Sequence, residues 1–142
     1  MALSKEQEEW LENNCRFKYG QLTGNFKNVP EEWATEEFFL EAVRKVGRVL
    51  EYVPEALKTE AVCFEAVRQQ GGFVLKYVPE ALVTEALCIE AVRSIGRTLE
   101  FVPDALKAET LCVEAVRNDK DAIQYVPKAL KDKVKAAKMM VI

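Results

Sequence analysis

The chain has 142 residues, of which 49% are hydrophobic and 30% are charged, with a formal net charge of -3. This balance predicts one folded domain or one short repeat array, and it excludes a disordered, collagen-like or low-complexity chain. No apolar run reaches the roughly 20 residues that a membrane-spanning helix needs, and the start of the chain lacks an apolar signal core. We therefore expect a cytoplasmic protein without a membrane span.

Residues 1–28 predict an N-terminal cap with a degenerate repeat. Ser4 and Gln7 have the spacing of a capping box, which predicts a helix through Trp10 and Leu11. The residues between this helix and the first Val-Pro dipeptide resemble an irregular copy of the unit that follows.

A tandem repeat of about 24 residues organises the rest of the chain. Val-Pro dipeptides begin at positions 29, 53, 78, 102 and 126, with spacings of 24, 25, 24 and 24 residues. This period predicts a C-terminal partial repeat and basic cap helix at 126–142. It also predicts four full helical repeats before that segment, at 29–52, 53–77, 78–101 and 102–125.

The start of the main helix in a unit is predicted from the N-cap residue before it. Thr35, Thr59 and Thr84 stand where an N-cap side chain would accept a backbone hydrogen bond, and each is followed by glutamate. Asp132 is predicted to cap the last helix. Ala108 has no capping oxygen, so the fourth unit lacks this interaction.

Glycine and proline predict where the helices end. Gly47, Gly71 and Gly96 are expected to end the main helices in a left-handed C-cap. The second half of the unit has helical apolar spacing, but its proline interrupts it. The sequence therefore predicts a kink at Val53 and a second short helix from Pro54.

The main helix has an unusually wide apolar arc. A helical wheel of residues 60–70 places apolar side chains over roughly 200° of the circumference. The residues on this arc are Val62, Cys63, Phe64, Ala66 and Val67. A helix of this kind contacts neighbours on both sides, so we predict an all-α solenoid of about five short helical repeats.

The repeat resembles a known family. The pattern L-x-T-E-x-x-C-x-E-A-V-R-x-x-G-x-x-L-x-x-V-P-E-x-L is similar to a short tandem domain of bacterial and viral proteins, known only as a domain of unknown function. The resemblance implies an all-helical array and no activity. The period is also loosely similar to leucine-rich variant repeats, whose cluster cysteines are missing here.

The cysteines predict packing rather than chemistry. Cys63, Cys88 and Cys112 share one core position, which Phe39 occupies in the first unit, so we expect buried free thiols. Cys15 is the one cysteine that we consider a candidate reactive thiol. Because the chain has no histidine and no Cys-x-x-Cys pair, we expect no metal, no cofactor and no enzymatic activity.

A ladder of glutamate and arginine is the candidate binding surface. Its members, one Glu/Arg pair in each full unit, are Glu41, Arg44, Glu65, Arg68, Glu90, Arg93, Glu114 and Arg117. One interpretation is a solvated ridge of weak salt bridges, and the other is a recognition ridge for a partner. The residues expected to tune its specificity are Lys45, Gln69, Ser94 and Asn118.

Aromatic and basic residues provide two further features. An aromatic residue precedes each Val-Pro in the series Tyr52, Tyr77, Phe101 and Tyr125, for which we favour core packing over stacking on a ligand. The last 17 residues carry five lysines, namely Lys128, Lys131, Lys133, Lys135 and Lys138. They favour solubility but also suit nucleic acid.

These features favour a non-enzymatic module that binds a protein or peptide. The alternative is a nucleic-acid-binding module that uses the arginine ladder and the lysine-rich C-terminal helix, although the acidic total charge opposes nucleic-acid binding. A delivered effector or inhibitor that acts by binding also fits the pattern. The apolar residues 139–142 suggest self-association through the C-terminus.

Overall fold

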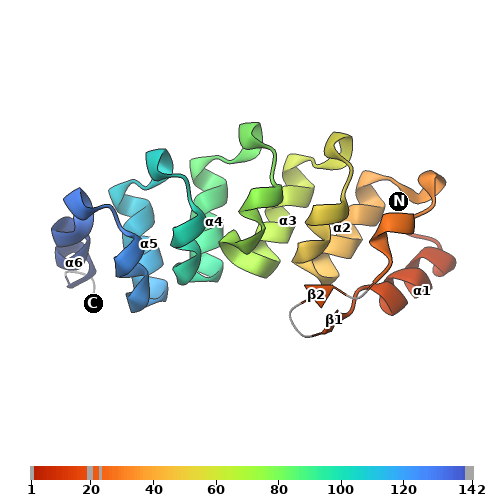
Figure 1. The fold of residues 1–142 in the computed structure, drawn as a ribbon, viewed down its shortest axis with the longest axis horizontal. Helices are drawn as coiled ribbons and strands as arrows, with labels where there is room; N and C mark the ends of the chain where they lie inside the picture. The colour runs from red at the N-terminus through yellow and green to blue at the C-terminus, as the bar shows by residue number, and fades with distance from the viewer. Residues whose placement is uncertain (1, 19–20, 23, 140–142) are drawn as a thin grey trace.

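A computed structural model describes residues 2–18, 21–22 and 24–139. The predicted all-α helical-repeat fold is confirmed, and Figure 1 shows the units stacked along one long axis. The α-helices are α1 (Lys5–Asn14), α2 (Glu36–Lys45), α3 (Glu60–Gln70), α4 (Glu85–Ser94), α5 (Glu109–Asn118) and α6 (Lys131–Met139).

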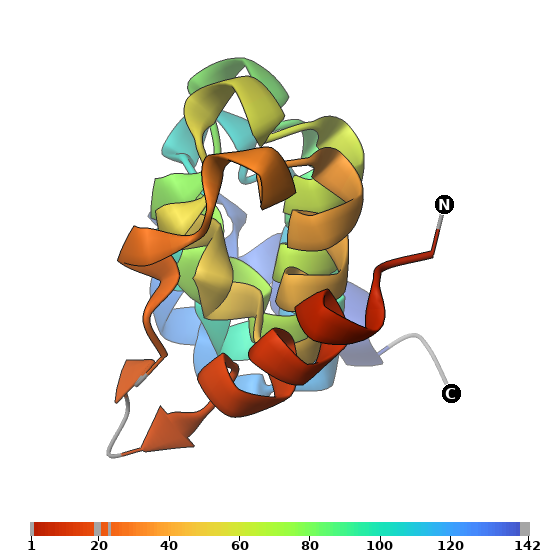
Figure 2. The same ribbon diagram turned by 90° about the vertical axis from the view of Figure 1, so that its right-hand side faces the viewer.

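Two kinds of 3-10 helix connect the α-helices. The longer ones are η3 (Gly47–Tyr52), η5 (Gly71–Tyr77), η7 (Gly96–Phe101) and η9 (Lys120–Tyr125). The short ones are η1 (Phe26–Asn28), η2 (Glu31–Trp33), η4 (Glu55–Leu57), η6 (Glu80–Leu82), η8 (Asp104–Leu106) and η10 (Lys128–Leu130). Figure 2, a view along the stack, shows the α-helices and the longer 3-10 helices on opposite sides, with the short helices at one edge.

The core fills the space between the two rows of helices. The alanine of each EAVR sequence is fully buried, and so are Leu50 and Leu99 from the longer 3-10 helices. Small alanine side chains let the helices approach closely, while the leucines fill the remaining volume. The core is therefore continuous from one unit to the next.

Threonine caps begin the α-helices as predicted. The Thr35, Thr59 and Thr84 hydroxyls each accept a hydrogen bond from the backbone three residues later, at 3.2 to 3.3 Å. Ala108 has the same extended backbone but no side-chain cap. The cap predicted at Asp132 is wrong, because Lys131 already has helical dihedral angles and Asp132 lies within the first turn of α6.

The kink before each short helix is confirmed. Val53 is extended, with φ -72° and ψ 130°, and η4 begins directly after Pro54. The ring of proline restricts the preceding residue to this conformation. The helices on both sides of the kink are 3-10 helices, which turn more tightly than α-helices.

The predicted left-handed caps at Gly47 and Gly96 are wrong. Among the described glycines, only Gly71 has a positive φ, at 61°, and its ψ of -148° lies outside the left-handed helical region, so the predicted cap is not formed there either. Gly47 is needed for a close approach, because a Cβ atom there would lie 2.6 Å from the Ala66 carbonyl oxygen of the next unit. A Cβ atom at Gly96 would likewise lie too close to the Ala115 carbonyl oxygen.

An aromatic cluster closes the N-terminal end. The Trp10 ring of α1 lies 5.0 Å from Phe26, 5.9 Å from Phe38 and 6.3 Å from Trp33. The Ser4–Gln7 capping box is present at the start of α1. After α1 the chain forms an antiparallel hairpin of two short strands, β1 (Phe17–Lys18) and β2 (Gln21–Leu22), each of two residues. This region therefore departs from the regular unit.

Helix α6 closes the other end. Val134 is fully buried against the last full unit, while Lys135 is exposed, as the sequence predicts for a terminal helix. The self-association predicted for residues 139–142 depends on residues 140–142, which lie outside the described residues, and on the side chain of Met139, which is also not described.

The missing cap at Ala108 predicts a simple stabilising change. Ala108 has φ -73° and ψ 163°, nearly the angles of the capping residue Thr59 at -74° and 167°. Ala108→Thr should therefore raise the free energy of unfolding by about 1 kcal/mol, and Thr59→Ala should lower it by about the same amount. Urea denaturation measures both, and an unchanged or less stable Ala108→Thr protein would contradict the assignment of this cap position.

Candidate functional site

The Glu/Arg ladder lies along α2, α3, α4 and α5. Three of its predicted pairs form within a helix: Glu41–Arg44 at 2.5 Å, Glu65–Arg68 at 3.3 Å and Glu114–Arg117 at 3.8 Å. The structure thus brings these residues together in successive helices of one row (Figure 1). The fourth predicted pair, Glu90–Arg93, is replaced by contacts between neighbouring helices.

Ion pairs also join successive helices of the ladder. Arg68 Nε lies 3.6 Å from Glu90, and Arg93 Nε lies 3.5 Å from Glu114. The predicted Glu90–Arg93 pair is replaced by these contacts, because Arg68 and Arg93 each reach the glutamate of the next unit. Arg68 and Arg93 remain more than half exposed, so each pair contributes only about 0 to 1 kcal/mol.

Two of the residues expected to tune specificity have a structural role instead. The Ser94 hydroxyl donates to the Arg68 carbonyl at 3.0 Å, and the Asn118 amide donates to the Arg93 carbonyl at 2.9 Å. Asn118 also accepts a hydrogen bond from the Gly96 backbone at 2.6 Å. These side chains satisfy carbonyls at the end of the preceding helix and tie neighbouring units together.

An apolar row runs beside the ladder, and the sequence reasoning missed it. It consists of the residue before the ladder glutamate in each full unit: Leu40, Phe64, Ile89 and Val113. Phe64 is 37% exposed, which corrects its placement in the core. Leu40 and Ile89 are half-buried, and Val113 is buried. The roughly 200° width of the predicted apolar arc is the sequence signal that could have revealed this row, because residues at the edge of so wide an arc face solvent. We call the ladder and this row together the ladder face.

The ladder face contains a groove between α2 and α3. Its volume is about 490 Å³, and its lining includes Leu40 and Arg44 from α2 and Phe64 and Glu65 from α3. A second groove of about 330 Å³ lies across α4, α5 and α6, where Ile89, Val113 and Ala137 are its apolar residues. Both grooves therefore place charged and apolar side chains of the same repeat positions side by side.

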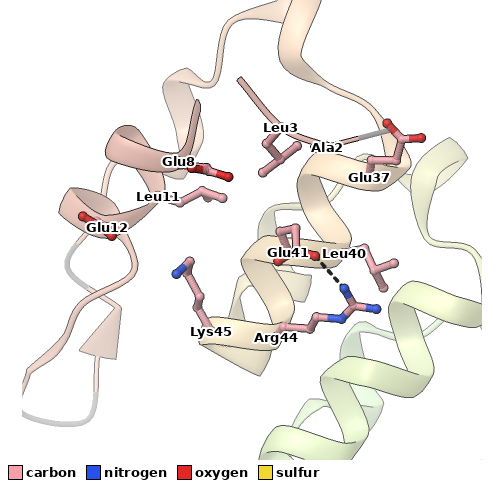
Figure 3. A pocket seen from close by; sticks show the side chains of 10 residues that line it. All are labelled: Ala2, Leu3, Glu8, Leu11, Glu12, Glu37, Leu40, Glu41, Arg44 and Lys45. Atoms are coloured by element: carbon pink, nitrogen blue, oxygen red, sulfur yellow. Dashed lines mark hydrogen bonds and ion pairs between the residues drawn. The ribbon is translucent and has the colours of Figure 1, made fainter. Parts of the chain in front are cut away.

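A third groove lies between α1 and α2, with a volume of about 440 Å³. In Figure 3, Leu3, Leu11 and Leu40 supply its apolar side chains, and the Lys45 ammonium points toward α1. The Glu41–Arg44 pair stands at its edge. The ladder face thus continues to the N-terminal end of the stack.

Most of the aromatic residues before Val-Pro pack as predicted. Tyr52, Tyr77 and Tyr125 are half-buried against the core, whereas Phe101 is 44% exposed, so the predicted core packing is wrong at this position. Phe101 contacts Phe73 with a ring separation of 5.4 Å on the longer 3-10 helices. This aromatic pair therefore lies on a different row of helices from the ladder face.

The cysteines are free, and those at the repeated position are buried as predicted. Cys63, Cys88 and Cys112 are at most 1% exposed. Burial raises the pKa of Cys63 and of Cys88 to about 11. Cys15 is not an activated thiol, because partial burial raises its pKa to about 11 despite the nearby charge of Lys45.

The part of the chain that the structure describes contains no group of three or more acidic or cysteine side chains placed to hold a metal ion. In the same ranges, every helix is too short or too polar to cross a lipid bilayer.

A known protein family matches part of the repeat region. Residues 35–83 match the profile of a family described as "Domain of unknown function (DUF4116)". This stretch runs from the cap of α2 to the residue after η6. No curated protein and no solved structure matches the chain.

The raised thiol pKa values predict protection from alkylation. A shift from about 9 to about 11 lowers the thiolate fraction at pH 8 roughly 100-fold. In a Cys15→Ser variant, Cys63 and Cys88 should therefore react with iodoacetamide at least 100-fold more slowly in native buffer than in denaturant, as measured by mass spectrometry. Burial also raises the pKa of Cys112, which should be protected in the same experiment. Rapid native labelling would contradict their burial.

The same shift has a defined effect on stability. Because the thiol pKa is higher in the folded than in the unfolded chain, the unfolded chain loses its protons first as the pH rises. The stability contributed by these thiols is complete below pH 9 and is lost as the pH approaches 11.

Proposed function

We propose that the chain is a non-enzymatic module that binds a protein partner through the ladder face. The observation that carries this proposal is the recurrence of an apolar side chain beside a Glu/Arg pair in each full unit, with grooves between the helices. Apolar side chains supply binding energy, and charged groups around them supply orientation. A delivered effector or an inhibitor would use such a surface in the same way.

Nucleic acid is the weaker alternative. The four ladder arginines each have a glutamate within 4.0 Å, so a phosphate bound to any of them would lie beside a carboxylate that repels it. The total charge of -3 also opposes attraction to a polyanion. Exposed lysines on α6, such as Lys133 and Lys135, are the feature that favours this alternative.

Partner capture with matched variants tests the proposal. The test variant is Arg68→Ala/Arg93→Ala, which removes two ladder charges. The control is Arg48→Ala/Arg97→Ala, which removes the same charge from η3 and η7. Both arginines are also ion-paired there, Arg97 exposed and Arg48 half-buried. We expect both variants to retain their free energy of unfolding within about 1 kcal/mol, since these pairs are exposed.

The expected result is a protein captured equally by the wild-type chain and by the control, and recovered at least tenfold less with the ladder variant. Equal recovery with both variants would contradict a site on the ladder face. A complex that disappears after nuclease treatment, and that weakens steeply with salt, would favour the nucleic-acid alternative instead.

A further inference from the structure

A second row of glutamates gives the ladder face an excess of negative charge. Each full unit begins its α-helix with a glutamate, one helical turn before the apolar row; these are Glu36, Glu60, Glu85 and Glu109. All four are exposed, and within the described part of the chain their carboxylates have no ion pair. Glu60 and Glu109 line the two grooves that contain Phe64 and Val113.

The ladder arginines do not balance this row. Their guanidinium groups already contact the ladder glutamates, so each unit presents one paired Glu/Arg couple and one unpaired carboxylate. The surface beside the apolar row is therefore acidic. A ligand that matches it has basic groups next to apolar ones.

The spacing of the row restricts the shape of the ligand. Neighbouring packed helices lie about 8 to 10 Å apart, so the apolar side chains recur at about that distance along the stack. A polyproline II segment rises about 9.3 Å over three residues, so every third side chain of such a segment matches one unit. A β-strand brings a side chain back to the same side after about 6.8 Å, which does not match.

The mixture of glutamate and arginine also favours an extended ligand. The backbone of a polyproline II segment has no internal hydrogen bonds, so its N–H and C=O groups are free. Carboxylates accept from such N–H groups, and guanidinium groups donate to such carbonyls. The backbone of a helical ligand is already satisfied and gains nothing from the ladder.

We propose that the ladder face binds an extended basic peptide segment with an apolar residue at every third position. The apolar residues lie on the row that includes Leu40, Phe64 and Ile89, and the basic residues pair with the unpaired glutamates. This inference rests on the proposed function, because it identifies the chemistry of the partner at the same surface.

Three synthetic peptides of twelve residues test the spacing and the charge. The first is (Leu-Lys-Ser)4, and the second contains the same twelve residues with its four leucines at positions 1, 3, 5 and 7. The third is (Leu-Glu-Ser)4, with the charge inverted. Fluorescence anisotropy with the full chain should show the first peptide binding at least tenfold more tightly than either of the others.

Matched variants then locate the site. The variant Glu60→Gln/Glu85→Gln/Glu109→Gln should bind the first peptide at least tenfold more weakly than the wild-type chain does. Glu51→Gln/Glu80→Gln/Glu100→Gln removes three exposed carboxylates from the 3-10 helices and should leave its affinity within twofold. Circular dichroism of both variants, compared with the wild-type chain, checks that each is folded.

Equal affinity for all three peptides, no binding of the first peptide, or an equal effect of both glutamine variants would overturn the inference. Such results leave the proposed function intact if the arginine variants still separate in partner capture. A partner retained by the ladder arginine variant would instead contradict the proposed function itself.

Discussion

The close approach of one unit's backbone to the α-helix of the next is the contact on which the stack depends. At Gly47 and Gly96 the start of a longer 3-10 helix lies so close to a carbonyl oxygen of the following α-helix that no side chain fits between them. Those carbonyls belong to Ala66 and Ala115, whose own side chains are small and fully buried. Asn118 strengthens the second contact by bonding both Gly96 and the end of α4.

This contact places the α-helices in one row, and the surface follows from that arrangement. Because the units repeat in register, equal positions of successive helices become neighbours in space, although 24 or 25 residues separate them in the chain. An arginine therefore reaches the glutamate of the next unit, as Arg68 reaches Glu90. The apolar row forms for the same reason, and the grooves lie between its members.

The sequence predicts the helices well because their signals are local. Threonine caps, the Val-Pro kink and the buried cysteines depend on a few neighbouring residues, and the structure has them at the predicted positions. The role of Gly96 and the bonds of Ser94 depend on contacts between units, which spacing along one chain does not reveal. The helical wheel predicts a core position for Phe64, which is wrong. A wheel gives the direction of a side chain but not the width of the neighbouring helix that would cover it.

The unfolding free energy of Gly96→Ala tests this account most directly. Gly96 does not have a positive φ, and at such positions alanine normally stabilises by about 0.4 to 1 kcal/mol. The close contact with Ala115 reverses the sign, and we expect a loss of about 1 to 3 kcal/mol by urea denaturation. Lys120→Ala, at the equivalent position of the last full unit, should change stability by less than about 0.5 kcal/mol. A Gly96→Ala protein as stable as the wild type, or more stable, would contradict the account.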